Sequence, residues 1–111
     1  MAQFMLLLHA DNSGFMKLSP EEMQKAIEKY SAWRSKPFVK GSNRLADDPG
    51  KIMRGAGANA RTTDGPYSEG KEVLGGYYLI EAANYEQAVK LAADHPHLDH
   101  GTIELRQVWG S

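Results

Sequence analysis

The alternation of hydrophobic and polar residues predicts three strong strands in this chain. Residues 4–8 are apolar on both alternating faces, which is typical of a strand buried on two sides and central in its sheet. Residues 75–81 are rich in aromatic and β-branched side chains, and residues 102–109 alternate apolar with charged positions. We therefore expect one sheet with the first strand in its middle.

Two amphipathic helices separate these strands. Ser19, Pro20 and Glu22 form a capping box with proline at the first helical position, and Pro37 ends the helix that follows. Asn84 caps a second helix, whose apolar residues recur at helical spacing up to the region before Pro96. Each helix has one face to pack and one face to expose to water, and the packed face of the first helix includes Tyr30 and Trp33.

The order of these elements is strand, helix, short strands, strand, helix, strand. It predicts a split βαβ sandwich of the α+β class, a ferredoxin-like fold with one antiparallel sheet and both helices on a single face. If Phe4, Leu6 and Leu8 point toward the helices, Met5 and Leu7 leave the opposite face partly apolar. A second copy of the chain is the simplest cover for that face, so we expect a homodimer, a barrel-like assembly of two α/β units.

Length and charge narrow the class of protein. The chain of 111 residues fits one domain, residues 1–111, with a single core. Its 13 basic and 14 acidic residues are spread along the sequence and provide no field that would gather nucleic acid or an anionic membrane. It has no cysteine, which excludes disulfides and thiolate chemistry. The apolar start is too short for a signal peptide or a membrane span, and we expect a cytoplasmic protein.

Residues 40–72 are rich in Gly, Asn, Asp and Arg and carry only weak strand signals. A structureless stretch of this length is uncommon in a compact domain, so it should contain short strands, a hairpin or a lid near a site. Residues 55–60 fit the G-x-G-x-x-A fingerprint of dinucleotide sites, but no helix can form before Asp64, and we reject that interpretation. The glycines form either a flexible surface loop or, with nearby basic residues, a small-anion site.

Residues 63–78 carry the most specific motif of the chain. They read Thr-Asp-Gly-Pro-Tyr-Ser-Glu-Gly-Lys-Glu-Val-Leu-Gly-Gly-Tyr-Tyr, and a helix, Pro96 and a strand at 101–106 follow at the expected distance. This combination resembles the YCII-related (DGPF-motif) family, with Tyr67 in place of the usual Phe and Gln107 where a proline often stands. The resemblance implies a ferredoxin-like dimer, a cleft between the sheet and the partner, and a His–Asp pair in many members. It implies no single established reaction.

The turn at Asp64, Gly65 and Pro66 and the histidines after the second helix are the candidates for chemistry. We expect Gly65 to supply a positive φ, while Asp64 either only caps the turn or also orients an imidazole and stabilises its charge. Three of the four histidines lie within residues 95–100, and imidazole is the side chain best suited to move protons near neutral pH. We take His97 as the catalytic acid–base and Asp64 as its partner.

The same histidines have two other interpretations. In one, His95 is a cation that favours the dipole at a helix C-terminus, and the others are solvated. In the other they bind a metal, but loop spacing this loose is poor evidence, and we expect neither a metal nor a cofactor.

Four further residues are candidates for contact with a substrate. His9 ends the first strand at the edge that faces residues 40–72, and it is the rival imidazole. Arg61 and Arg106 can hold an anionic substrate, Arg106 by a bidentate fork, and Tyr67 belongs to the motif itself. For Arg106 the ordinary alternative is a cross-strand charge pair.

These residues support two functions of different classes. The first is a small-molecule enzyme with lyase-like or hydrolytic chemistry, which uses a His–Asp pair in a cleft at the dimer interface. The second is a non-catalytic ligand-binding or regulatory module in which the histidines only line that cleft. The sequence leaves both open.

Overall fold

The computed structural model describes residues 1–11 and 17–111 of the chain. Along these residues the elements are, in order, β1 (Ala2–Ala10), α1 (Pro20–Arg34), β2 (Val39–Arg44), β3 (Lys51–Arg54), η2 (Gly57–Asn59), β4 (Arg61–Asp64), β5 (Val73–Ala82), α2 (Tyr85–Ala92), η3 (Pro96–Asp99) and β6 (Thr102–Gln107). The three strong strands and two helices expected from the sequence are all present.

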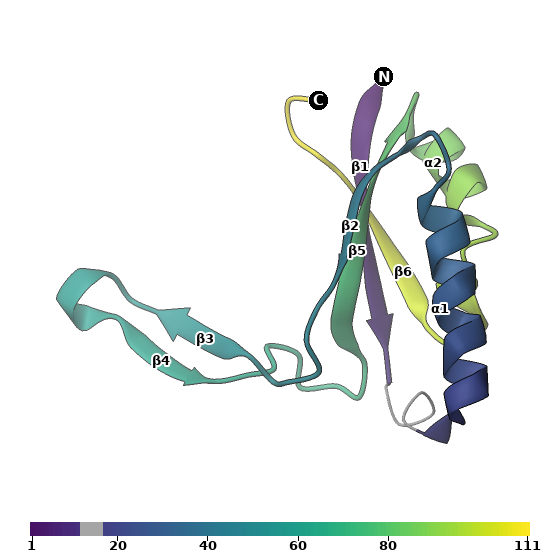
Figure 1. Ribbon diagram of the computed structural model, residues 1–111. Helices are drawn as coiled ribbons and strands as arrows, with labels where there is room; N and C mark the ends of the chain where they lie inside the picture. The colour runs from purple at the N-terminus through teal and green to yellow at the C-terminus, as the bar shows by residue number, and fades with distance from the viewer. Residues whose placement is uncertain (12–16) are drawn as a thin grey trace.

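One antiparallel sheet in the strand order β2-β5-β1-β6 forms the body of the molecule. Its central strands are β1 and β5, with Phe4 opposite Ile80 and Leu6 opposite Tyr78. Figure 1 shows both helices on one face of this sheet. The prediction of an α+β chain with a ferredoxin-like arrangement is confirmed, whereas the barrel-like dimer stays a prediction.

The helices begin where the sequence predicts. The Ser19 hydroxyl accepts a bond from the Glu22 amide and the Glu22 carboxylate accepts one from the Ser19 amide, so two otherwise unpaired N–H groups are satisfied. At α2 the side chain of Asn84 accepts from the Gln87 amide. These caps fix the residue at which each helix begins.

Alternate residues of β1 divide the core from the opposite face of the sheet. Phe4 and Leu6 are buried beneath the helices, in one hydrophobic cluster with Trp33 of α1. Met5 and Leu7 point the other way and are only half-buried. We call the face of the sheet that carries Met5 and Leu7 the free face, because both helices lie on its other side (Figure 1).

Residues 40–72 contain a hairpin, one of the forms expected for them. β3 and β4 pair as a separate two-stranded sheet, with Arg54 opposite Arg61 beside the η2 turn. Figure 1 shows this hairpin, here called the arm (residues 51–64), projecting from the body on the side opposite the helices. All arm residues except Ile52 are exposed, and the radius of gyration of 15.9 Å exceeds the roughly 13 Å of a compact domain of this length. The arm extends the molecule and adds nothing to its core.

Candidate functional site

His97 lies on the helix-covered side of the sheet, in the turn η3 that follows α2. Its Nε2 atom stands 2.8 Å from the carbonyl oxygen of His9, and its Nδ1 atom stands 3.0 Å from the hydroxyl of Tyr30. The same hydroxyl lies 3.2 Å from Nε2 of His100. The fold thus places a phenol from α1 between two imidazoles, and we call Tyr30, His97 and His100 the Tyr30 cluster.

The hydrogen bonds of the Tyr30 cluster run in one direction. A carbonyl oxygen only accepts, so Nε2 of His97 must carry a proton and donate it to His9. Nδ1 of His97 is then the acceptor of the Tyr30 proton, and the Tyr30 oxygen accepts from Nε2 of His100. The chain from His100 through Tyr30 to His97 connects atoms close enough for proton transfer.

Burial decides the charge of the cluster at neutral pH. Desolvation lowers the pKa of His97, which is 6% exposed, and it raises the pKa of Tyr30 above the ordinary value of a phenol. Both shifts favour the uncharged form. The cluster therefore holds a neutral phenol against a neutral imidazole, and Tyr30 keeps a proton that it can donate.

The cluster lines a cleft of about 290 Å³ between α1 and the sheet. Leu8, Ala26 and Ile27 supply apolar surface, and Arg34 and Arg44 line the same space. A cleft of mostly apolar lining with a few convergent polar groups and shifted pKa values is the usual form of a small-molecule site.

His95 belongs to the core and not to the cleft. It is 2% exposed, and its ring packs against those of Trp33 and Tyr78 at centroid distances of 4.5 and 4.6 Å. Its Nδ1 atom accepts a bond from the backbone amide of His97. Burial lowers the pKa of His95 to about 4, so the ring is neutral at neutral pH. The interpretation of His95 as a cation at a helix end is wrong, because in the core a charged ring would lose its hydration.

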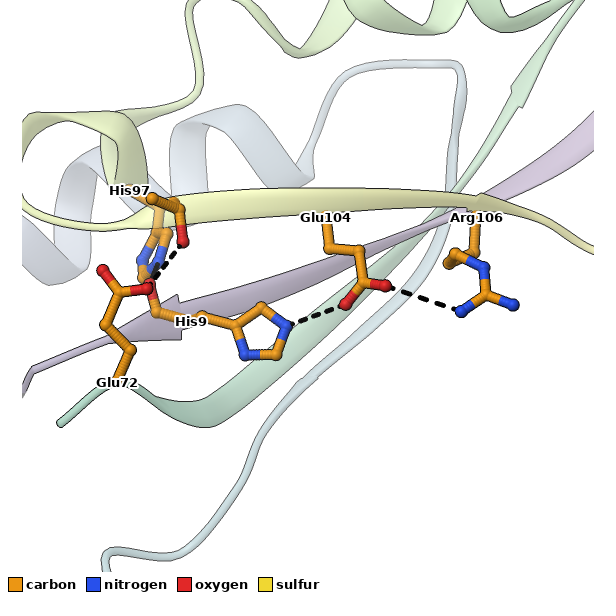
Figure 2. Close-up of polar contacts among 6 residues, drawn as sticks. His9, Glu72, His97, Glu104 and Arg106 are labelled. Carbon is orange, nitrogen blue, oxygen red and sulfur yellow. Dashed lines mark hydrogen bonds and ion pairs between the residues drawn. The ribbon is translucent and has the colours of Figure 1, made fainter. Parts of the chain in front are cut away.

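His9 presents its carbonyl to His97 and its side chain to the free face. Nε2 of His9 stands 3.1 Å from one carboxylate oxygen of Glu104, and the other oxygen lies 3.5 Å from Nη1 of Arg106. Figure 2 shows these three side chains in a row along β6, with Glu72 beside them. Arg106 does form a charge pair, but its partner Glu104 lies two residues away on the same strand, so the cross-strand pairing expected for Arg106 is not the one observed. The contact that crosses from β1 to β6 is that of His9 with Glu104.

Asp64 and His97 do not meet within one chain. The Asp64 carboxylate lies on β4 of the arm and forms an ion pair with Lys51. His97 instead bonds to Tyr30 and His9. The predicted pair is not formed because β4 leads away from the body, whereas η3 packs beneath α1 (Figure 1).

Gly65 is required for a different reason from the one expected. Its φ is not positive, in contrast to Gly50, Gly55 and Gly57 nearby. A Cβ atom at Gly65 would instead collide with the carbonyl oxygen of Pro49. Close approach of two backbone segments at the base of the arm therefore explains this glycine.

A groove of about 790 Å³ lies at the base of the arm. His9 and Tyr67 line it together with the loop 45–50, so two of the predicted substrate contacts share one space. Arg61 lies at the other end of β4, opposite Arg54, and is not part of this groove.

Residues 1–11 and 17–111 contain neither a metal-binding cluster nor a membrane-spanning helix. Within these ranges no group of three or more His, Asp or Glu side chains is placed to hold a metal ion. No helix in the same ranges is long and apolar enough to cross a membrane.

Tyr30 is the residue of the cleft that the sequence pattern did not single out. Its helical spacing assigns it to the packed face of α1, and that placement is correct. The available signal was its hydroxyl, because a tyrosine on a packed face usually needs a hydrogen-bond partner. The partner is 67 residues further along the chain, which no local pattern shows.

The fold and the cleft define a small α+β protein with a cavity of about 290 Å³ beneath its first helix. The family model of the YCII-related domain matches residues 3–110. The chain therefore belongs to the YCII-related domain family. No curated protein matches the sequence.

Proposed function

We propose that this protein is a small-molecule enzyme that transfers a proton in the cleft under α1, with the hydroxyl of Tyr30 as the transferring group. The supporting observation is the phenol held between His97 and His100, at 3.0 and 3.2 Å, on the wall of a cavity. The Tyr30 hydroxyl can turn from Nδ1 of His97 to a bound ligand and give it the proton. A His100 ring that carries protons on both nitrogens can then return one through Nε2, which leaves His100 as a neutral imidazole. Lyase-like and hydrolytic reactions both require such a transfer.

His97 positions the phenol in this proposal. Its Nε2–H group is fixed on the His9 carbonyl, so Nδ1 is always the acceptor that faces Tyr30. The proton-moving role that the sequence suggested for His97 therefore passes to Tyr30. Asp64 has no part in the cleft of its own chain.

A non-catalytic ligand-binding module is the second candidate. One observation favours this module. The hydrogen-bond chain from His100 through Tyr30 to His97 ends at the backbone carbonyl of His9, which cannot pass a proton on. A chain of this kind also serves a purely structural purpose, since it ties α1 and η3 to the end of β1.

Filling the cleft tests whether ligands bind there. Ala26 lines the cleft, so Ala26→Phe should place a ring in the cavity, whereas Ala32→Phe changes an exposed position of the same helix. We expect small molecules found by NMR screening to shift the signals of Tyr30 and Ala26 in the wild type. Their affinity should fall by about tenfold or more in Ala26→Phe and stay unchanged in Ala32→Phe. Ligands that bind both variants alike would contradict the proposed site.

Tyr30→Phe separates the enzyme from the binding module. The change removes only the hydroxyl, so ligands of the cleft should still bind, while turnover of a substrate should fall by roughly 10²–10⁴-fold. Each ligand from the screen is incubated with wild type and variant, and product formation is followed by NMR. Turnover that survives in Tyr30→Phe would exclude Tyr30 as the transferring group, and ligands that are never converted would favour the module.

A homodimer through the free face is the second part of this proposal. Met5 and Leu7 are half-buried there, and Met53 on the arm is 70% exposed, so a partner would cover apolar surface. The arm, with Lys51, Arg54, Arg61 and Asp64, has a formal charge of +2, so the rest of a chain of net charge -1 carries -3. An arm and a body of opposite charge favour contact between two copies. In such a dimer the groove beside His9 would lie next to the interface.

Leu7→Lys tests the homodimer. A lysine in the middle of an apolar interface loses its hydration, so we expect the dimer to dissociate at least tenfold more readily than in the wild type. Val89→Lys is the matched control, because Val89 is an exposed apolar residue on α2, on the other side of the sheet. Sedimentation velocity over a range of concentrations measures both. A wild-type protein that stays monomeric at all concentrations would contradict the homodimer.

A further inference from the structure

Two arginines line the cleft, and one aspartate offsets part of their charge. Arg34 lies in the last turn of α1 and Arg44 ends β2, and both line the cleft together with Asp47. Nη2 of Arg44 stands 3.0 Å from the carboxylate of Asp47. The lining therefore has a net positive charge even when His100 is neutral.

Both arginines lie close enough to the cleft to act on its phenols. Burial is the main influence on Tyr30 and Tyr78 and raises the pKa of each hydroxyl. Arg44 acts in the opposite direction on Tyr30, and Arg34 does so on Tyr78. A negative charge placed beside these hydroxyls would be stabilised by the same two cations.

The remaining lining is apolar and the space is small. Leu8, Ala10, Ala26 and Ile27 form the apolar part, and the volume of about 290 Å³ is at the lower end of ligand pockets. The cleft therefore suits a single ring or a short chain. A phosphate dianion would bring more charge than the lining offsets, which is costly in a partly buried site. A monoanion with an apolar body matches both the charge and the surface.

We infer that the ligand of this cleft is a small monocarboxylic acid, bound as its anion. This inference rests on the proposed function. Arg34 and Arg44 hold the carboxylate, because the planar guanidinium fork matches the two carboxylate oxygens. The apolar body lies against Leu8 and Ile27. This placement leaves the rest of the ligand within reach of the Tyr30 hydroxyl.

Benzoate and benzamide provide a matched pair of probes. They have nearly the same shape, but only benzoate is charged. In NMR titrations of the wild type we expect benzoate to shift the signals of Ala26 and Tyr30, and benzamide to bind about tenfold more weakly or less well still. Arg34→Gln should weaken benzoate binding by about tenfold, and Arg34→Lys, which keeps the charge, by less. Arg106→Gln, on the free face, should leave benzoate binding unchanged.

The outcomes distinguish this inference from the proposed function. Equal affinity for the two probes, or unchanged benzoate binding in a folded Arg34→Gln variant, overturns the carboxylate inference and leaves a cleft that binds small molecules. Failure of both probes to bind also overturns it. Whether the cleft binds any ligand is decided separately by the comparison of Ala26→Phe with Ala32→Phe. Urea unfolding of Arg34→Gln and Arg106→Gln shows whether either change affects the fold itself.

Discussion

Between pH 6.5 and pH 4 the protein is expected to lose about 3 kcal/mol of folding free energy because of His95 alone. The ring is 2% exposed among aromatic side chains, and burial lowers its pKa from 6.5 to about 4. The unfolded chain therefore takes up a proton at His95 well before the folded chain does. Stability is unaffected by this group above about pH 6.5, falls as the pH drops, and stops changing once the folded protein is protonated too.

Two other groups also make the stability depend on pH. Burial lowers the pKa of His97 as well, so His97 adds to the folding free energy that is lost as the pH falls. Bonds from Trp33 and then Lys36 hold the pKa of Asp94 below its ordinary value of 3.8. That carboxylate contributes stability above its ordinary pKa and loses it below, so its effect begins where the effect of His95 ends.

Urea unfolding of the wild type and His95→Asn at several pH values measures the effect. The asparagine oxygen can still accept from the His97 amide, but asparagine does not titrate, so the variant should be less stable at pH 7 and less sensitive to acid. In the wild type the C2 proton of His95 should titrate well below the usual range of histidine. A midpoint near 6.5 for that proton, or an unchanged acid response in His95→Asn, would contradict the assignment.

Gly101→Ala should cost about 2–3 kcal/mol of folding free energy. A Cβ atom at this position would stand 2.5 Å from both the His9 carbonyl oxygen and Nε2 of His97. Neither atom is at the end of a flexible side chain, because one is backbone and the other belongs to a ring fixed by Tyr30. The methyl group must therefore push His97 away from His9, which also breaks the bond that fixes the tautomer of the cluster.

Gly41→Ala is the control for this change. Gly41 lies in β2, its φ is not positive, and no atom lies within 4 Å of a Cβ built there. The urea midpoint of Gly41→Ala should stay close to that of the wild type, while Gly101→Ala should unfold at a clearly lower urea concentration. The Nε2–H signal of His97 should move in Gly101→Ala only. A variant at position 101 that is as stable as the one at position 41 would show that the ring can shift without cost.

The fold was predictable from local signals, and the cluster was not. The capping residues at Ser19 and Asn84 and the doubly apolar β1 are each encoded within a few neighbouring residues, and the structure confirms them. The Tyr30 cluster joins residues 67 and 70 positions apart, so it depends on how α1 and η3 pack. Periodicity places Tyr30 on the correct helix face but says nothing about which side chain it meets there.

The prediction for His95 and the expected contact of Asp64 with His97 both differ from the structure of the single chain for the same physical reason. His95 and Asp64 were each interpreted from their neighbours along the chain, one as a helix-end cation and the other as a partner for His97. Burial decided the first, since three aromatic rings surround His95. The direction of a hairpin decided the second, since β4 carries Asp64 away with Lys51. Neither property is written in the spacing of residue types.

Position 9 gives independent experimental access to the two sides of the sheet. The backbone of His9 contributes its carbonyl to the Tyr30 cluster, whereas its imidazole lies on the free face beside Glu104. Every amino acid has the same carbonyl, so a series of substitutions at this position changes the free face chemically while the acceptor for His97 is conserved by the main chain. An effect of such a series on ligand binding under α1 would be a direct report of communication through the sheet.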